Sequence, residues 1–385
     1  MKVMTILGTR PEIIRLAAII KMLDKHCDHI LVHTGQNYDR NLNAVFFEDL
    51  DLRQPDYVLE TKSGTIQGQI AAIIEKTGDV MDKENPNAIV ILGDTNSGLS
   101  AICAKRKKIP IFHIEAGDRS FDNDVPEELN RRIVDHASDI NLAYTEHSRR
   151  NLLREGLHPR NIMVVGSPVY EVYDAMKEKF SASLILTKLG LTPGNFFTAS
   201  IHREENVDKG GAIETLVDTF NALAETYDCP IIVSTHPRTR RRLEQLRLLE
   251  RSNSLINWHE PFGLIDFIRL QTESRCVISD SGTIHEDSAI LGFPAIAIRK
   301  STEKQESLEA GYCPITGLQK EDVLRAVKLV VEDPIDIARS PAPEAYLQRE
   351  VSKKIARIIL GMSRVVDEQV WGAKDKKFIK GAGNG

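Results

Sequence analysis

Cysteine is scarce and long apolar runs are absent from the 385-residue sequence, and each absence excludes a class of protein. The five cysteines show no CxxC spacing and predict neither a disulfide framework nor a zinc site; they are Cys27, Cys103, Cys229, Cys276 and Cys313. No apolar stretch approaches the roughly 20 residues of a membrane span, and the first apolar run is too short for a secretory signal peptide. We therefore expect a reduced, cytoplasmic protein with no membrane partner.

A basic excess is missing as well. The formal net charge is -5 and the sequence pI is about 6.2, whereas nucleic-acid-binding domains usually carry a surplus of Lys and Arg. The GxGxxG pattern of NAD-binding folds is also absent. An anionic ligand would therefore be held by locally placed Arg, Lys and His side chains and by backbone N–H groups. We expect no nucleic-acid partner, no metal and no cofactor.

Short apolar runs alternate with amphipathic helical patterns, first in one half of the chain and then again in the other. The strand-like runs of the first half are 3–7, 30–33, 88–92, 110–114, 140–143 and 162–165. Those of the second half are 196–200, 230–234, 255–258, 275–279 and 294–298. Helical patterns between them cover 13–23, 65–81, 97–107, 148–155, 211–227, 238–250, 264–272 and 284–291. This alternation is typical of βαβ units and parallel sheets.

The predicted fold class is α/β, with two Rossmann-like, doubly wound parallel-sheet domains that face a central cleft. A length of 385 residues favours two domains. We assign residues 1–168 to the first domain, with a hinge at 166–168, and residues 169–365 to the second. A helical pattern at 345–364 is expected to cross back, and residues 366–385 to end in a flexible tail. Ligands of such sheets bind beyond the carboxyl ends of the strands.

Polar motifs follow the strand-like runs of the first half. Residues 8–10, Gly-Thr-Arg, come directly after the first run, and free N–H groups at a helix start together with Arg10 would suit a phosphate. Asp94 and Glu115 follow two later runs. Each residue also has a purely structural explanation. Arg10 could be a surface arginine in an ordinary turn, Asp94 a helix cap, and Glu115 the partner of Arg119 in an ion pair. Glu127 lies at an acidic helix start, where the helix dipole explains the residue type without catalysis.

The second half carries similar motifs. His202 and Arg203 follow its first strand-like run and suit a diphosphate, because a histidine near neutral pH can carry charge or donate a proton. Ser281 and Gly282 form a strand-to-helix turn with N–H and hydroxyl donors. Glu286 or Asp287, one turn further on, would accept from ribose hydroxyls, and His236 is a further candidate contact. The structural alternative is a helix capped by Asp280 or Ser281.

Together these motifs resemble the non-hydrolysing UDP-N-acetylglucosamine 2-epimerase family over residues 1–365. The segments GTRPE, GDT, HIEAG, PEELNR, HREEN and DSGTIHED occur in the family's order and approximate spacing. The resemblance implies the GT-B-like two-domain fold, a homodimer and a UDP-sugar substrate. It also implies active-site roles for Arg10, Arg15, Asp94, Glu115, Glu127 and His202, and a UDP-holding role for Ser281, Gly282 and Glu286, with Asp287 as a close second.

Two departures from the family pattern carry predictions. Arg15 stands where the N-acetylglucosamine enzymes usually have lysine, and the two side chains are not interchangeable. Residues 35–39, GQNYD, replace the segment that bacterial enzymes use for allosteric activation, so we expect such activation to be weak or absent. The segments GTRPEIIRL, HTGQNYD, AGDRSFDNDVPEELNRRIVDH and YTEHSRR look closer to the branch that interconverts UDP-2-acetamido-2,6-dideoxy-L-talose and UDP-N-acetyl-L-fucosamine for capsule and O-antigen synthesis.

The reaction implied by the resemblance couples removal of the C2 proton to loss of UDP, which leaves an enzyme-held glycal to which UDP returns. It needs a base, an acid on the opposite face and stabilisation of the departing diphosphate. Asp94, Glu115 and Glu127 are the candidates for acid and base, without assignment to a face, and Arg10, Arg15 and His202 for holding UDP. The alternatives are a UDP-N-acetylglucosamine 2-epimerase, a hydrolysing epimerase, a GT-B glycosyltransferase and a non-enzymatic nucleotide-sugar sensor.

Overall fold

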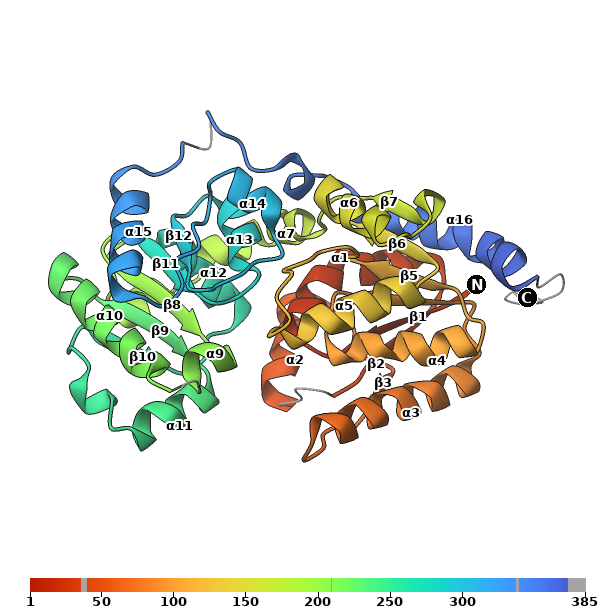
Figure 1. The fold of residues 1–385 in the computed structure, drawn as a ribbon, viewed down its shortest axis with the longest axis horizontal. Helices are drawn as coiled ribbons and strands as arrows, with labels where there is room; N and C mark the ends of the chain where they lie inside the picture. The colour runs from red at the N-terminus through yellow and green to blue at the C-terminus, as the bar shows by residue number, and fades with distance from the viewer. Residues whose placement is uncertain (36–39, 209, 337–338, 373–385) are drawn as a thin grey trace. The chain divides into compact units, whose positions relative to one another are not determined.

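The strands form where the sequence has its short apolar runs. Strand β4 (Ala88–Leu92), for example, reads AIVIL and is buried along its whole length. Parallel strands covered by helices on both faces have this continuous apolar character, because neither face meets water. The computed structural model describes residues 1–35, 40–208, 210–336 and 339–372. It divides into two units, Met1–Ala175 with the chain from Ala345 on, and Met176–Glu344 (Figure 1).

The first unit is built on a seven-stranded sheet in which all pairs are parallel. Its strands, in spatial order, are β3 (Tyr57–Val58), β2 (Asp28–His33), β1 (Lys2–Leu7), β4, β5 (Ile111–Ile114), β6 (Ile140–Ala143) and β7 (Ile162–Val164). From β1 the chain adds strands first on one side and then, beginning with β4, on the other. The boundary between β1 and β4 is therefore the topological switch point of this sheet.

Helices cover both faces of this sheet, because right-handed crossovers that run in opposite directions lie on opposite faces. The helices are α1 (Arg10–His26), α2 (Arg40–Asp49), α3 (Ile66–Glu84), α4 (Ser100–Arg106), α5 (Pro126–Ala137), α6 (Glu146–Arg154), α16 (Val351–Trp371) and the start of α7 (Val169–Ala182). Side chains of α3, α4 and α5 pack with alternate strand residues in one buried cluster. Helices α1 and α16 pack against each other.

The C-terminal helix α16 returns to the first unit, as expected from the sequence. The Ser167 N–H donates to the Ala345 carbonyl at 2.8 Å, and the Lys354 ammonium donates to the Val165 carbonyl at 2.9 Å. Gly166 has a φ of +85°, and a Cβ there would lie 2.7 Å from the Gln348 side chain, so glycine permits this close approach. Residues 345–365, which the sequence analysis grouped with the second domain, therefore belong to the first unit, and the chain enters the second unit within α7.

The second unit is built on a five-stranded parallel sheet. Its strands, in spatial order, are β10 (Ile256–His259), β9 (Ile231–Thr235), β8 (Phe197–Ile201), β11 (Cys276–Ser279) and β12 (Ala295–Ala297). Its helices after α7 are α8 (Ile185–Leu189), α9 (Glu204–Val207), α10 (Ala212–Tyr227), α11 (Pro237–Gln245), α12 (Leu264–Glu273), α13 (Ile284–Leu291), α14 (Gln305–Glu309) and α15 (Lys320–Glu332). The order of strands reverses between β8 and β11, which is the switch point here.

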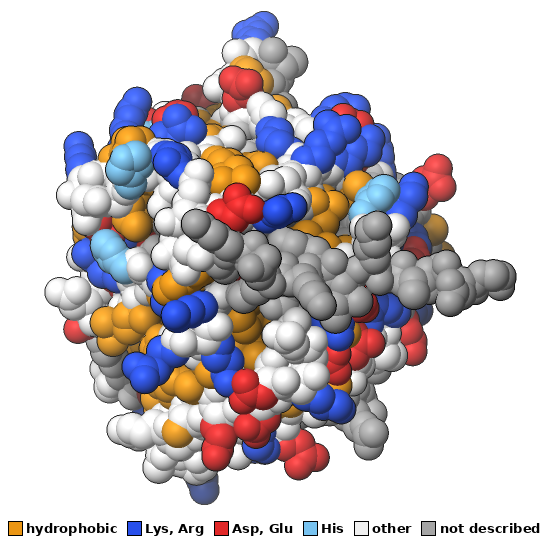
Figure 2. Space-filling view, turned by 90° about the vertical axis from the view of Figure 1, so that its right-hand side faces the viewer, with side chains coloured by type: hydrophobic (Ala, Val, Ile, Leu, Met, Phe, Trp, Pro, Cys, Tyr) orange, Lys and Arg blue, Asp and Glu red, His pale blue; other side chains and the backbone are white. Residues whose placement is uncertain are grey.

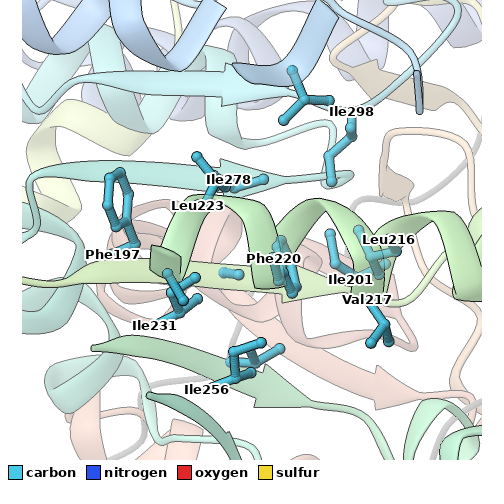
Figure 3. Packing of buried hydrophobic residues seen from close by; sticks show 14 of the residues in the cluster. Phe197, Ile201, Leu216, Val217, Phe220, Leu223, Ile231, Ile256, Ile278 and Ile298 are labelled. Atoms are coloured by element: carbon cyan, nitrogen blue, oxygen red, sulfur yellow. The ribbon is translucent and has the colours of Figure 1, made fainter. Parts of the chain in front are cut away.

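The core of the second unit shows how the two periodicities meet. Leu216, Phe220 and Leu223 lie on one face of α10 at helical spacing, and Phe197 and Ile201 lie on one face of β8 at strand spacing. Figure 3 shows these side chains packed between the helix and the sheet. The α/β class with two Rossmann-like parallel sheets, predicted from the same periodicities, is confirmed.

Short 3-10 turns complete the fold at Asn96–Leu99, Pro159–Asn161, Leu249–Arg251 and Glu344–Tyr346. On the face drawn in Figure 2, Lys and Arg side chains lie among Asp and Glu side chains, in keeping with the modest net charge of -5. Within the described ranges, none of the helices combines the length and the apolar character that a bilayer crossing requires.

Candidate active site

Several of the predicted polar residues lie just beyond the carboxyl ends of strands at or near the two switch points. In the first unit, the residues after β1, β4 and β5 are Gly8, Gly93 and Glu115, and Arg10 and Asp94 follow within two residues. In the second unit, His202 follows β8 and Asp280 follows β11. A switch point leaves a crevice between two strands whose connections run in opposite directions, and open α/β sheets bind ligands there.

Glu115 is held in an unusual backbone conformation directly after β5. Its φ is +65°, in the left-handed region that non-glycine residues rarely adopt. The Glu115 carboxylate accepts hydrogen bonds from the Arg15 guanidinium of α1, and both residues are buried. Its Oε2 atom lies 3.4 Å from the position that a Cβ on Gly93 would take. Strained, charged positions of this kind are found at functional sites more often than elsewhere.

Asp94 is tied to helix α5. The Asp94 carboxylate pairs with the Arg131 guanidinium, which also donates to Glu128 at 3.1 Å. The Asn130 side-chain amide donates to the Asp94 carbonyl at 3.0 Å. Thr95, not Asp94, is the N-cap of the following 3-10 turn. Thr95 thus takes the N-cap position that the sequence offered to Asp94, and the Asp94 side chain keeps about a quarter of its surface exposed (25%).

Glu127 and Glu128 are neighbours in the first turn of α5 but differ in surroundings. Glu128 is buried and accepts from the Ser120 N–H at 2.9 Å and from Arg131, so it serves the structure. Glu127 is partly exposed, and within the described residues its carboxylate has no hydrogen bond or ion pair. Of the two acidic residues, Glu127 is the one available to a ligand.

Glu12 is a buried carboxylate that joins two loops at the switch point of the first unit. It accepts from the Gly8 N–H at 3.0 Å, from the Thr9 hydroxyl at 2.8 Å and from the Thr95 hydroxyl at 3.1 Å. Burial raises the pKa of Glu12 to about 7, although these hydrogen bonds act in the opposite direction. Arg10, two residues earlier, lies with its guanidinium 5.7 Å from the centre of the Phe46 ring.

A second buried network supports β5 from behind. His113 lies between the Asp135 carboxylate, at 2.8 Å, and the Gly93 carbonyl, at 2.7 Å. Arg119 pairs with Asp135 and with Glu155, each at 2.7 Å. The structural alternative for Glu115, a pair with Arg119, is therefore replaced by the pair with Arg15.

Asp280 organises the predicted site of the second unit. Its buried carboxylate accepts from the backbone N–H groups of His202, at 3.0 Å, and Arg203, at 2.9 Å, and from the Asn206 amide at 3.1 Å. It also lies 3.0 Å from Nδ1 of His202, whose side chain is 47% exposed. Burial alone would raise the pKa of Asp280, but His202 and the donated hydrogen bonds hold that pKa below its ordinary value.

The loop after Asp280 is closely packed. Within it, the Ser281 hydroxyl lies 3.1 Å from the Thr283 hydroxyl, and the Ser281 N–H donates to Ser279 at 3.1 Å. A Cβ on Gly282 would lie 2.5 Å from the Glu303 carboxylate and 3.3 Å from the guanidinium of Arg299, so a larger residue there would displace the Glu303 side chain. Neither Asp280 nor Ser281 is the N-cap of α13, which is Thr283.

The remaining candidates of the second unit occupy three different settings. Glu286 and Asp287 lie in the first turn of α13, and both are buried. His236 is exposed at the end of β9 and caps α11, accepting from the Arg238 N–H at 3.3 Å. Arg203 is tied to the Asp280 carbonyl at 2.9 Å. His202, Arg203, Ser281 and Gly282 thus lie around Asp280, whereas His236 lies at the end of a different strand, β9.

Sequence reasoning missed the residues that hold the predicted ones. Glu12, Arg131 and Asn206 were not singled out, and Asp280 was considered only as a helix cap. A signal existed for Glu12, because Thr9 and Glu12 have the S/T-x-x-E spacing of a capping box. Residues 36–39 of the GQNYD segment lie outside the described residues, so the expectation about activation stays a prediction. In the described part of the chain, no three His, Cys, Asp or Glu side chains are grouped as metal ligands.

Comparison with known proteins gives the same family as the sequence motifs. The chain matches the model of the UDP-N-acetylglucosamine 2-epimerase family over residues 21–360. A solved UDP-N-acetylglucosamine 2-epimerase from Rickettsia bellii is 44% identical, with 97% of this chain and 99% of that chain covered and a TM-score of 0.90. A UDP-GlcNAc 2-epimerase from Methanocaldococcus jannaschii, solved with UDP-GlcNAc and UDP, is 35% identical, with coverages of 94% and 100% and a TM-score of 0.87. A UDP-2,3-diacetamido-2,3-dideoxy-D-glucuronate 2-epimerase from Pseudomonas aeruginosa is 32% identical over 85% of this chain and 92% of its own length.

Proposed function

This chain belongs to the UDP-N-acetylglucosamine 2-epimerase family, and from that membership we propose that it inverts carbon 2 of a UDP-linked N-acetylamino sugar without net hydrolysis. The observation that carries the proposal is the Glu115–Arg15 pair, with Glu115 in a left-handed backbone conformation at the carboxyl edge of the sheet. A buried carboxylate fixed at a ligand-binding edge is suited to proton transfer.

The proposed reaction proceeds by elimination and re-addition. A base removes the C2 proton while the C1–O bond to UDP breaks, so that the electron pair of the C2–H bond forms a C1–C2 double bond and UDP leaves with the electrons of the C1–O bond. Protonation of C2 from the opposite face and return of UDP to C1 then give the epimer. We assign the proton transfers to Asp94, Glu115 and Glu127, without assigning a face to each.

Stabilisation of the departing diphosphate is the second requirement, because negative charge grows on UDP as the C1–O bond breaks. We assign this role to Arg10, Arg15 and His202, with further UDP contacts from Arg203, Ser281, Gly282, His236, Glu286 and Asp287. The hydrogen bonds from His202 and Arg203 to Asp280 support the assignment, since they fix both backbones next to the Ser281 loop.

For the sugar, we propose the pair UDP-2-acetamido-2,6-dideoxy-L-talose and UDP-N-acetyl-L-fucosamine, with the product destined for capsule or O-antigen. The segments 8–16 and 116–136 of the sequence support this choice. The alternative is the pair UDP-N-acetylglucosamine and UDP-N-acetylmannosamine. In its favour, the relatives from R. bellii and M. jannaschii are named UDP-N-acetylglucosamine 2-epimerases. We also propose a homodimer.

Incubation with each UDP-sugar in D2O tests the reaction. Epimerisation places deuterium at C2 while the nucleotide sugar stays intact; a hydrolysing enzyme accumulates UDP, and a transferase or sensor incorporates no deuterium. The preferred substrate is the one with the higher kcat/KM in the same assay.

Replacing the carboxylates separates catalysis from binding. We expect Glu115→Gln and Asp94→Asn to lower kcat by about 10²-fold or more, the size of a lost general acid or base, while UDP binds as before in calorimetry. Glu146→Gln is the matched control, because its carboxylate is 57% exposed on α6 and pairs with Arg149. Near-normal kcat in Glu115→Gln would mean that Glu115 is not catalytic.

A further inference from the structure

Glu12 makes a connection that the proposed reaction does not use. Its side chain belongs to the first turn of α1, and the residue is only 2% exposed. One carboxylate oxygen, Oε2, accepts from the Gly8 N–H and the Thr9 hydroxyl in the loop after β1. The other oxygen, Oε1, accepts from the Thr95 hydroxyl in the loop after β4. One side chain therefore joins the two loops that flank the switch point.

Helix capping explains only the bonds to Oε2. In a capping box, a glutamate at the third helical position returns to the residue that caps the helix, and Thr9 and Glu12 have this spacing. The Thr9 hydroxyl, however, makes no capping bond to the helix N–H groups and donates to Glu12 instead. The bond to Thr95 spans 83 residues and adds nothing to the capping of α1.

The burial of Glu12 is also more than a cap requires. An exposed glutamate in the first turn already complements the helix dipole and keeps its hydration. Glu12 gives up that hydration, and its burial raises the pKa to about 7. A carboxylate that loses its hydration in order to join two distant loops breaks a local rule of folding. Such exceptions are expected at functional sites.

We propose that Glu12 is a positioning residue of the epimerase site. It holds the loop after β4, which carries Asp94, in place relative to the loop after β1, which leads into Arg10. The proposal rests on the proposed function, since Asp94 and Arg10 are its assigned catalytic and UDP-binding groups. Asp94 adjoins Thr95, and its carboxylate is tied on the side of α5 by Arg131. Loss of the Thr95 bond removes the tie to the β1 loop and lets the Asp94 carboxylate shift relative to the sugar.

Two threonine variants separate bridging from capping. Thr95→Val removes the bridge and leaves both bonds to Oε2, whereas Thr9→Val removes one bond to Oε2 and leaves the bridge. We expect Thr95→Val to lower kcat for C2 deuterium incorporation about tenfold with little change in KM, because small displacements of a catalytic group reduce turnover steeply. Thr9→Val should lower kcat by less than about threefold. Equal losses in the two variants, or wild-type kcat in Thr95→Val, would overturn the proposal.

An activity-independent measurement distinguishes failure of this proposal from failure of the proposed function. We expect amide hydrogen exchange of residues 93–97 to be faster in Thr95→Val than in the wild type and in Thr9→Val, since local opening becomes easier when a tie is lost. Unchanged exchange there would overturn the bridge even in an active enzyme. If instead exchange is faster in Thr95→Val but the wild-type protein turns over no UDP-sugar, the bridge stands and the proposed function is refuted.

Discussion

At the scale of single residues, the candidate site consists of charged side chains whose partners come from distant parts of the chain. Glu115 pairs with Arg15, which is 100 residues away, and Asp94 with Arg131, which is 37 residues away. His202 and Asp280 are 78 residues apart. In the Glu115–Arg15 pair both residues are buried, and removing either partner would leave an uncompensated buried charge.

This pairing also explains which site residues the sequence revealed. Asp94, Glu115 and His202 directly follow apolar runs, so their place at a sheet edge can be read from local pattern. Arg131 and Asp280 act through contacts with those residues, and such contacts depend on how strands and helices are brought together. Asp280 even has a sufficient local explanation as a helix cap, which hid its role beside His202. The sequence therefore predicted the residues at the sheet edge but not those that hold them in place.

The raised pKa of Glu12 predicts a specific pH dependence of stability. Its pKa rises from 4.5 in the unfolded chain to about 7 in the fold, mainly through burial. The folded protein therefore retains a proton that the unfolded chain has lost, so the contribution of Glu12 is fully present below pH 4.5 and is lost as the pH rises through 7. The loss amounts to about 3 kcal/mol of unfolding free energy.

Glu12→Gln removes this titration. We expect the unfolding free energy of the wild type, measured relative to that of the variant by urea denaturation, to fall by about 2.5 kcal/mol between pH 5 and pH 8. The exposed Glu146→Gln should track the wild type at both pH values. Parallel curves for the wild type and Glu12→Gln would show that Glu12 is already ionised in the folded protein at low pH.

At the scale of elements, strand and helix positions followed from periodicity where the pattern was long or fully buried. Strands β4 and β6 and helix α13 have the residue ranges predicted from sequence. Strand β3, in contrast, has two residues at the sheet edge, too few for a period-2 signal. The Gly-Ser-Pro sequence at 166–168, just before helix α7, predicts a hinge between the domains. In the structure this segment is instead held by a hydrogen bond from the Ser167 N–H to the Ala345 carbonyl of the returning chain.

Helix α16 carries a prediction about the first unit. It packs against α1, and Ile359 on α16 is fully buried. We expect Ile359→Ala to lower the unfolding free energy of this unit by about 2–5 kcal/mol, the usual cost of deleting a buried isoleucine side chain. Val370→Ala, at a position that is 47% exposed on the same helix, is the matched control and should change stability by less than about 0.5 kcal/mol.

The two tryptophans allow this measurement to be made unit by unit. Trp371 is the last residue of α16 in the first unit, and Trp258 lies in β10 of the second. In a Trp258→Phe background, the fluorescence of Trp371 reports denaturation of the first unit. If the denaturation midpoint followed by this fluorescence is unchanged in Ile359→Ala, the packing of α16 does not stabilise the first unit.

At the scale of the whole molecule, the chain builds the same arrangement twice without an internal sequence repeat. Each unit has a parallel sheet with one switch point, and at each switch point a buried carboxylate, Glu12 or Asp280, accepts a hydrogen bond from the backbone of the loop after β1 or β8, respectively. The assigned proton-transfer groups lie in the first unit, and most of the assigned UDP contacts lie in the second. The proposed reaction therefore requires both units to act on one substrate molecule.

This requirement can be tested by hydrogen exchange with and without UDP. If both clusters bind one sugar diphosphate, UDP should slow exchange in residues 8–15 of the first unit as well as in residues 200–206 and 279–286 of the second, because a ligand stabilises the segments that it contacts. Residues 109–111 and 229–231, at the amino ends of β5 and β9, are internal controls and should exchange as before. Asp280→Asn, which alters the His202 loop, should weaken protection in both units together. Protection confined to the second unit would mean that the first unit does not contact the diphosphate, and Arg10 and Arg15 would then lose their assigned role in stabilising the departing UDP.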